Sequence, residues 1–356
     1  MRISVSLHRL ALTDWPGVTA WAQEADRLGV HSLWTAEAWA HDAMTPIAYL
    51  AAKTENLKFG TGITQVGTRT PALVAMTSQC LWEMSNGRFI LGLGSSGPQV
   101  IEGWHGIPFR KPLARTRELV EVCRKIFNGE VLEYDGEFHH MPLPVELGGS
   151  GEGKALKPGA PPTPDLPIYI ASLGPKNLQM TGAVADGWLG GSFIPEHAAL
   201  FIDNIREGAA AVGRDISHFD YAVGSSIHVT DDPERVAETM KPDMAFRLGA
   251  MGSKAHNFYN DAYRRQGFAD EAMEIQRLWL SGDREAARKA VPTELVLSTN
   301  VIGDRQQVID RLRLYKDAGV TTFRAGVPGE SFGQKAENLG AIMDLMREVN
   351  AEPAKA

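Results

Sequence analysis

Residues 168–190 read IYIASLGPKNLQMTGAVADGWLG, and this stretch decides how the chain folds. It begins with a short apolar run, Ile168–Ala171, which is typical of a buried strand. Pro175 suits the first turn of a helix, because the N–H that proline lacks is unpaired there anyway. A second apolar run, Gly187–Gly190, follows. A strand, a helix and a strand in this order predict a βαβ unit with parallel strands.

The same alternation extends over almost the whole chain of 356 residues. The other six predicted strands are Ile3–Leu7, Ser32–Thr35, Leu57–Thr61, Phe89–Leu93, Tyr221–Val229 and Thr321–Ala325. Eight such runs with helices between them predict an α/β fold whose parallel strands close into a single (β/α)8 barrel, a TIM barrel. An open, doubly wound sheet is the structural alternative, and periodicity alone does not distinguish the two.

Two segments depart from this alternation. Residues 141–165 are crowded with glycine and proline, which predicts a long loop of the kind that often forms a lid or a binding loop. Residues 242–297 are helical by pattern but too long for one barrel helix, so we expect a helical insertion after the seventh strand. Residues 1–350 are therefore predicted to form one barrel domain, with a frayed tail at 351–356.

Composition limits the class of protein. The chain is 44% hydrophobic and 22% charged, with a formal net charge of −7, which argues against a broad basic face for nucleic acid. No apolar run approaches the roughly 20 residues that cross a bilayer, and polar residues come too early for a signal peptide. The two cysteines fit a reducing compartment. We expect a cytoplasmic protein that binds neither nucleic acid nor membranes.

Glycines and hydroxyl residues follow the third and fourth predicted strands. They therefore lie at the carboxyl ends of the strands, where barrel enzymes have their active sites. GTGIT, residues 60–64, either lets the backbone approach a flat ligand or forms a tight turn. GLGSSGP, residues 92–98, offers room for a planar ring and hydrogen bonds from Ser95 and Ser96. Its spacing is not that of a dinucleotide fingerprint, so we do not interpret it as an NAD site.

The fifth predicted strand runs directly into a helix. Free N–H groups and the helix dipole at Ser172, Leu173 and Gly174 favour a phosphate, to which Lys176 can add its charge. An empty, capped helix start is the ordinary alternative. These patterns alone indicate a barrel enzyme with a phosphate-bearing ligand.

Two residues are candidates for proton transfer. Glu37 lies just beyond the second strand, where it is either an exposed loop carboxylate or an active-site group. His105 follows the glycine-serine loop and is placed to wall a pocket. No metal site is expected, because the adjacent His139 and His140 would face opposite sides of a strand and neither HExxH nor CxxC occurs.

Three longer motifs resemble the luciferase-like monooxygenase superfamily. The most specific is GSSGPQVIEGWHG, residues 94–106, followed by LGPKNLQMTGAVADGW, residues 173–188. MGSKAHNFYNDAYRRQGF, residues 251–268, with AVPTELV downstream, is similar to methylenetetrahydromethanopterin reductase-like members. The likeness is strongest to the F420-dependent oxidoreductases and extends from near residue 1 to about residue 348.

The resemblance implies a (β/α)8 barrel that forms homodimers or larger homo-oligomers. It also implies a non-proline cis peptide bond at Gly62–Ile63 that backs a deazaflavin ring, and a phosphate site at the start of the helix after the fifth strand. The cofactor-binding residues are then expected to be Gly62, Ile63, Thr64, Ser95, Ser96, Ser172, Leu173, Gly174 and Lys176. Lys254, Arg264 and Arg265 either meet the phosphate or glutamyl tail or lie on a solvated helix face.

The function that the resemblance implies is hydride transfer between coenzyme F420 and a small organic substrate. One departure matters: glucose-6-phosphate dehydrogenases of this superfamily carry an Asp-His pair and a glutamate where this chain has Glu37, Ala38 and Gly97. Their acid-base mechanism is therefore not expected here. The alternatives are an FMN-dependent monooxygenase that uses reduced flavin and O2, since FMN shares the tricyclic ring and phosphate, and a non-catalytic flavin- or deazaflavin-binding protein.

Overall fold

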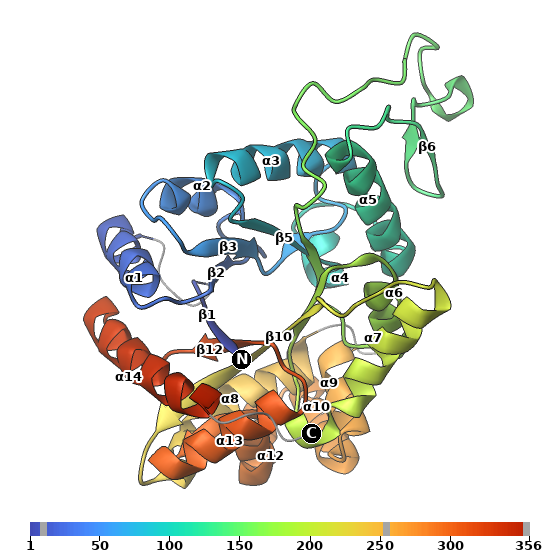
Figure 1. Cartoon of the computed structure of the whole chain (residues 1–356). Helices are drawn as coiled ribbons and strands as arrows, with labels where there is room; N and C mark the ends of the chain where they lie inside the picture. Colours follow the sequence, from blue (N-terminus) through green and yellow to red (C-terminus); the bar gives the residue numbers. More distant parts are fainter. Residues whose placement is uncertain (8–12, 252–256, 352–356) are drawn as a thin grey trace.

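The computed structural model describes residues 1–7, 13–251 and 257–351, so Lys254 and the tail beyond residue 351 lie outside the described residues. All eight predicted strands are present and parallel, and the pairing of the last with the first closes the barrel. The predicted fold is therefore confirmed (Figure 1). In barrel order the strands are β1 (Arg2–Ser6), β2 (Ser32–Thr35), β3 (Lys58–Thr61), β5 (Phe89–Gly94), β8 (Ile168–Ile170), β9 (Gly187–Gly190), β10 (Asp220–Val229) and β12 (Thr322–Gly326).

Helices surround this barrel and bury one face each against it (Figure 1). They are α1 (Trp15–Arg27), α2 (Thr45–Ala51), α3 (Pro71–Met84), α4 (Pro98–Ile101), α5 (Pro112–Phe127), α6 (Pro175–Val184), α7 (Ala199–Ala211), α13 (Arg305–Asp317) and α14 (Phe332–Ala351). Capping residues in the sequence explain where these helices begin and end. The Asp14 carboxylate caps α1 by accepting a hydrogen bond from the N–H of Gly17 at 3.0 Å, and Gly29, with φ of 77°, follows its end.

A helical segment runs from β10 to the last barrel unit. Its helices are α8 (Pro233–Ala250), α9 (Phe258–Arg265), α10 (Ala269–Leu280), α11 (Arg284–Lys289) and α12 (Thr293–Thr299), followed by the short strand β11 (Val301–Gly303). The segment begins at Pro233 rather than at residue 242, because Asp232 caps a helix that continues through Pro242. It has a hydrophobic core of its own around Tyr263 and Leu295.

The connection between α5 and β8 projects from the body of the molecule (Figure 1). It contains a hairpin of β6 (Tyr134–Asp135) and β7 (His140–Met141) and the 3-10 turn Val145–Leu147. The buried Glu118 accepts hydrogen bonds from the N–H groups of the hairpin turn, which holds Phe138 against Arg115. Residues 141–165 themselves do not line the two cavities described below, because they lead to the amino-terminal end of β8.

The floor of the barrel is a polar network around the buried Asp220, whose carboxylate accepts hydrogen bonds from Tyr169 and Thr322 and pairs with Arg2 at 2.8 Å. Above it, the inner core is small, with Trp34, Ile90 and Leu189 among its members. The ligand site is therefore restricted to the other end, where the strands end. In the described part of the chain, no helix is long and apolar enough to span a membrane.

Candidate active site

A backbone bulge lies at the mouth of the barrel directly after β3. The Gly62–Ile63 peptide bond is cis, as the resemblance implied, and the chain returns to the sheet as the short strand β4 (Thr64–Gln65), which pairs with β5. The N–H of Gly62 donates to the carbonyl of Thr35 at 2.5 Å, which fastens the bulge to β2. The half-buried Ile63 packs on the inner core, so its side chain forms part of the floor of the mouth.

The glycines of β5 make room for this bulge. A Cβ added to Gly92 would lie 1.7 Å from the carbonyl oxygen of Thr61, and one added to Gly94 would lie 2.9 Å from Ile63 Cγ1. The hydroxyl of Thr61 also donates to the carbonyl of Gly92 at 2.7 Å. The space at these two glycines is therefore filled by the bulge on which a ring would rest, while the room that residues 92–98 offer to a planar ring stays a prediction.

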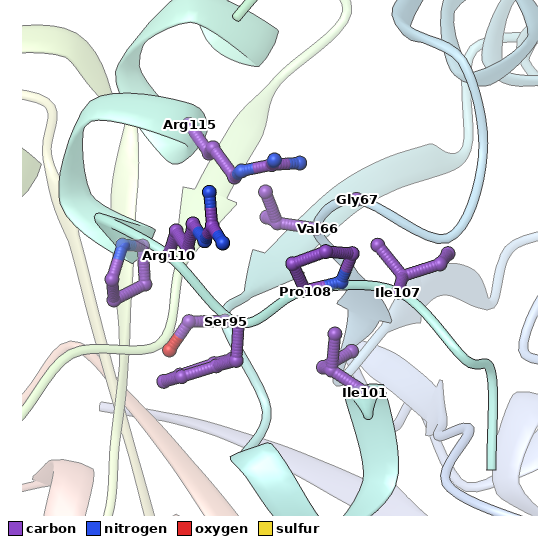
Figure 2. A pocket seen from close by; sticks show the side chains of 10 residues that line it. Val66, Gly67, Ser95, Ile101, Ile107, Pro108, Arg110 and Arg115 are labelled. Atoms are coloured by element: carbon purple, nitrogen blue, oxygen red, sulfur yellow. The ribbon is translucent and has the colours of Figure 1, made fainter. Parts of the chain in front are cut away.

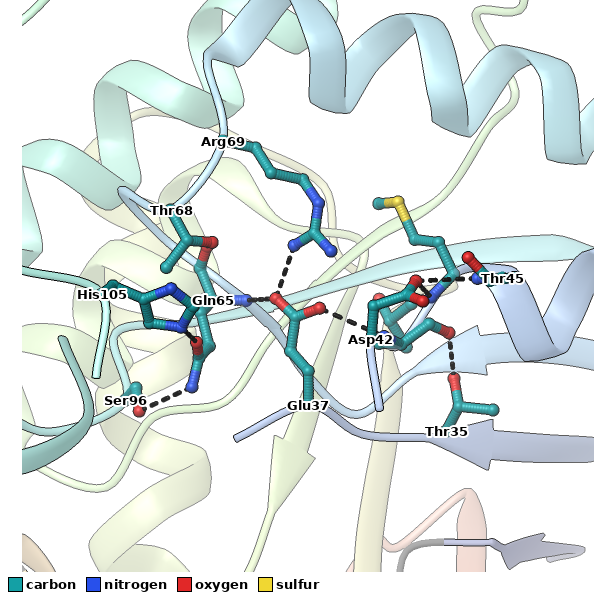
Figure 3. A network of polar contacts seen from close by, with 12 residues as sticks. Thr35, Glu37, Asp42, Thr45, Gln65, Thr68, Arg69, Ser96 and His105 are labelled. Atoms are coloured by element: carbon teal, nitrogen blue, oxygen red, sulfur yellow. Dashed lines mark hydrogen bonds and ion pairs between the residues drawn. The ribbon is translucent and has the colours of Figure 1, made fainter. Parts of the chain in front are cut away.

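Glu37 holds two loops together. Its Oε1 accepts hydrogen bonds from the N–H of Gln65 at 2.8 Å and from Arg69 Nη1 at 2.6 Å, and its Oε2 accepts one from the N–H of Ala43 at 3.1 Å (Figure 3). Its side chain is 7% exposed. Because both oxygens already accept hydrogen bonds, the geometry suits a positioning role better than the proton transfer that the sequence suggested.

Replacing Glu37 with glutamine is therefore expected to lower the free energy of unfolding by about 1–3 kcal/mol, because Arg69 loses the carboxylate with which it forms an ion pair in a partly buried site. Thermal or denaturant unfolding measures this loss. The control is Glu274→Gln, which removes an exposed pair with Arg277 and should change stability by less than about 0.5 kcal/mol. Equal effects in the two variants would contradict the positioning role.

Gln65 connects the two proton-transfer candidates. Its backbone N–H binds Glu37, while its side-chain Oε1 lies 2.8 Å from His105 Nε2 and its Nε2 donates to Ser96 Oγ at 3.1 Å (Figure 3). An amide oxygen only accepts, so the proton of the neutral ring lies on His105 Nε2 and the lone pair on Nδ1. Sequence reasoning missed Gln65, since no local pattern shows that its side chain meets a residue 40 positions away.

A cleft of about 260 Å³ opens beside this network. Its lining combines the loops after β2, β4 and β5 and includes Glu37, His41, Arg69, Trp104 and His105. Trp104 is 64% exposed, so it lies on the rim rather than in a packed core. The cleft therefore offers a histidine, an arginine and an aromatic side chain to a ligand at the barrel mouth.

The loop between β8 and α6 differs from the prediction in its side chains. The Ser172 hydroxyl is turned inward onto Thr181 Oγ1 at 2.8 Å, so only the backbone of Ser172 faces the helix start. Leu173 and Gly174 precede α6, which has no side-chain cap, and Lys176 is exposed in its first turn. The Asn177 Oδ1 atom is buried there without a partner in the structure. The anion site at this helix start therefore stays a prediction that rests on the backbone alone.

The two other described basic residues differ in their relation to this loop. Arg265 reaches it and donates to the Leu173 carbonyl at 2.7 Å, which braces the loop; a contact of Arg265 with a phosphate stays a prediction. Arg264 pairs with Asp261 on the exposed side of α9.

A small basic cavity of about 10 Å³ that sequence reasoning missed lies before and at the start of α5 (Figure 2). Arg110 and Arg115 line it together with Ser95 and Gly67. Neither arginine forms an ion pair with a carboxylate among the described residues, and Arg115 Nε is buried without a partner. Since α5 and α6 follow the neighbouring strands β5 and β8 and pack together, the two features lie on the same side of the barrel.

Comparison with known proteins gives these features a context. A family model described as luciferase-like monooxygenase matches residues 2–322. A Mycobacterium tuberculosis protein whose name provisionally calls it a coenzyme F420-dependent oxidoreductase is 38% identical over 301 residues, 83% of this chain and 86% of that protein. The 5,10-methylenetetrahydromethanopterin reductase of Archaeoglobus fulgidus is 31% identical over 287 residues, 79% of this chain and 80% of its own.

The fold also matches a solved structure, the coenzyme F420-dependent tetrahydromethanopterin reductase from Methanopyrus kandleri. The TM-score is 0.74, and the match covers 95% of this chain and 97% of that one. At 23% identity, this likeness shows a shared fold.

Proposed function

Because the chain belongs to the luciferase-like monooxygenase family and is an oxidoreductase, we propose that it transfers a hydride between coenzyme F420 and a small organic substrate. The observation that carries this proposal is the Gly62–Ile63 bulge together with the basic cavity of Arg110 and Arg115. A flat ring with a phosphate and an acidic tail requires these two surfaces together. The two relatives at 38% and 31% identity are named as a putative coenzyme F420-dependent oxidoreductase and as a 5,10-methylenetetrahydromethanopterin reductase.

The residues at the mouth fit such a cofactor. Gly62, Ile63 and Thr64 would hold the ring, and the unpartnered Arg115 Nε is a shielded donor that a phosphate oxygen can satisfy. The phosphate would be held by the backbone of Leu173 and Gly174 and by the two arginines of the cavity, Arg110 and Arg115. When bound, F420 supplies a hydride donor or acceptor at its deazaflavin ring.

The chain contributes orientation, exclusion of water and one proton. Reduction of an organic group by a hydride also needs a proton, and His105 Nδ1 is the ring atom that Gln65 leaves available. In the protonated ring this atom can donate the proton, and in the neutral ring it can accept one in the reverse direction. Ser95 and Ser96 remain proposed cofactor contacts, with Ser96 also orienting Gln65.

His105→Asn is expected to lower kcat by about 100-fold, because positioned acid-base groups contribute roughly 10²–10⁴-fold. Gln65→Leu should leave the ring in place but unoriented, so nitrogen-15 NMR of its imidazole should change from the Nε2–H tautomer to a mixture. F420 affinity should change less than about threefold in both variants, since neither side chain touches the proposed ring or phosphate site. An unchanged tautomer in Gln65→Leu would overturn the orienting role of Gln65.

The proposal is tested by a substrate screen with reduced F420 in the absence of oxygen. Loss of the absorbance of reduced F420 on addition of one class of organic acceptor supports hydride transfer. The FMN alternative predicts the reverse pattern, in which turnover requires O2 and reduced flavin. A protein that binds the cofactor but turns over no acceptor under either condition would support the non-catalytic alternative.

We also propose that the chain forms a homodimer or a larger homo-oligomer. Leu73, Met76 and Met84 on α3 are 49%, 62% and 55% exposed, and a second copy would cover such an apolar surface. Sedimentation at micromolar concentration decides this point, and a monomer would contradict it.

A further inference from the structure

Among the described residues, an arginine inside the barrel forms no ion pair with a carboxylate. Arg324 is the third residue of β12, and its strand neighbours Phe323 and Ala325 pack into the main core. Because side chains alternate along a strand, Arg324 points to the barrel interior. In the parallel register it lies opposite Gly224 of β10 and Ser4 of β1.

The guanidinium crosses β10 and reaches the end of β9. Arg324 Nη2 donates to the carbonyl of Gly190, the last residue of β9, at 2.6 Å. The path is open because Gly224 lacks a side chain; a Cβ there would lie 3.1 Å from Nη2. The charged group is therefore held at the level of the mouth rather than in the barrel floor.

No carboxylate neutralises this charge among the described residues. The carboxylate of Asp220, on the floor of the barrel, already pairs with Arg2 and accepts hydrogen bonds from Tyr169 and Thr322. Arg324 Nε is shielded from solvent and has no hydrogen-bond partner. Burial lowers the pKa of Arg324 to about 10, so the group stays charged near neutral pH. Arg324 as a whole is half-buried, and charges shielded from water in this way are normally paired, so an unpaired one at the mouth is a place where a ligand can supply the opposite charge.

The position of the guanidinium indicates which ligand this is. The guanidinium lies at the end of β9, which is three strands from β3 through β5 and β8, so it lies across the mouth from the Gly62–Ile63 bulge. The proposed phosphate site lies beside β5 and β8, and β9 pairs with β8. Arg324 therefore lies at the edge of the proposed cofactor contacts, where the mouth continues toward β10 and β12, which carry none of them.

We propose that Arg324 binds an anionic oxygen group of the substrate, so that the enzyme acts on small organic acids that carry a carboxylate. This inference rests on the proposed function for the placement of the cofactor. A guanidinium binds a carboxylate through two parallel hydrogen bonds, which would also orient the molecule for hydride transfer.

The test measures carboxylate binding by calorimetry, with and without F420. The probes are formate, pyruvate and benzoate, each compared with its neutral amide. At least one carboxylate is expected to bind the wild-type protein at least tenfold more tightly than its amide. Arg324→Met should abolish this preference and Arg324→Lys should retain part of it. Arg264→Met, which removes an exposed arginine of α9, should leave it unchanged.

Three results would overturn the inference: no carboxylate preference in the wild-type protein, an equal preference in Arg324→Met, or a loss of F420 affinity of more than tenfold in that variant. The last result would assign the guanidinium to the cofactor. Arg324→Met should also unfold at no lower temperature than the wild type, since it removes an unpaired charge. If this variant does not fold, Arg324→Lys takes its place in the test. A carboxylate preference in Arg324→Lys as large as in the wild type then overturns the inference. If F420 does not bind at all, the proposed function fails, while carboxylate binding to the protein alone still decides the role of Arg324.

Discussion

Gly92→Ala is expected to abolish F420 binding and to lower the free energy of unfolding by more than about 3 kcal/mol, the upper part of the range for overpacking a core. The reason is steric. The new Cβ would lie 1.7 Å from the Thr61 carbonyl oxygen and 2.9 Å from Leu189 Cδ1, and backbone on one side and a packed core on the other leave it no room. The bulge that follows Thr61 must then move, and with it the proposed floor for the ring.

Two further glycines calibrate this prediction. Gly94→Ala meets only the side chain of Ile63, at 2.9 Å, so it should weaken F420 binding with a smaller loss of stability. Gly340→Ala in α14 has no atom within 4 Å of the new Cβ and should raise stability by about 0.5–1 kcal/mol. Thermal unfolding and fluorescence titration measure both quantities. Gly92→Ala with wild-type stability and affinity would show that the bulge does not hold the cofactor.

The double variant Arg110→Met, Arg115→Met is expected to weaken F420 binding by at least about 100-fold, because each hydrogen bond to a charged group contributes roughly 1.5–3 kcal/mol. The two side chains line the same cavity and have no carboxylate partner among the described residues, so their removal leaves no unpaired acid behind. The melting temperature should therefore stay close to that of the wild type.

The matched controls change either the protein or the ligand. Arg117→Met removes an exposed arginine from the same helix and should leave affinity unchanged. A deazaflavin that lacks the phosphate and glutamyl tail should bind the double variant and the wild type equally. Weakening of both ligands to the same degree would mean that the arginines support the ring or the fold, and the assignment of this cavity to the phosphate would be wrong.

The fold could be predicted from the sequence because its information is local. Each barrel strand is a short apolar run, and each helix after it has its own starting signals, such as Asp14 for α1 and Pro175 for α6. The helix start after Ser172 also predicts an anion site without any tertiary contact, because it depends on backbone geometry alone.

The roles of single side chains could not be predicted, because they depend on partners far away in the sequence. Gln65 meets His105 across 40 residues, and Arg324 reaches Gly190 across 134. The sequence places the Ser172 hydroxyl where it could bind a phosphate, yet in the structure this hydroxyl forms a hydrogen bond with Thr181 and points inward. Glu37 is of the residue type that often serves as a catalytic acid, but its three donors are Ala43 after β2, Gln65 at the end of β4 and Arg69 in the loop that follows.

The most direct test of the central claim is a paired equilibrium titration of the purified protein with F420 and with FMN, each oxidised and reduced. The mouth described here predicts micromolar or tighter binding of F420, with FMN at least tenfold weaker. Tighter binding of FMN, together with oxygen consumption once the flavin is reduced, would contradict the account and make this chain a flavin-dependent monooxygenase.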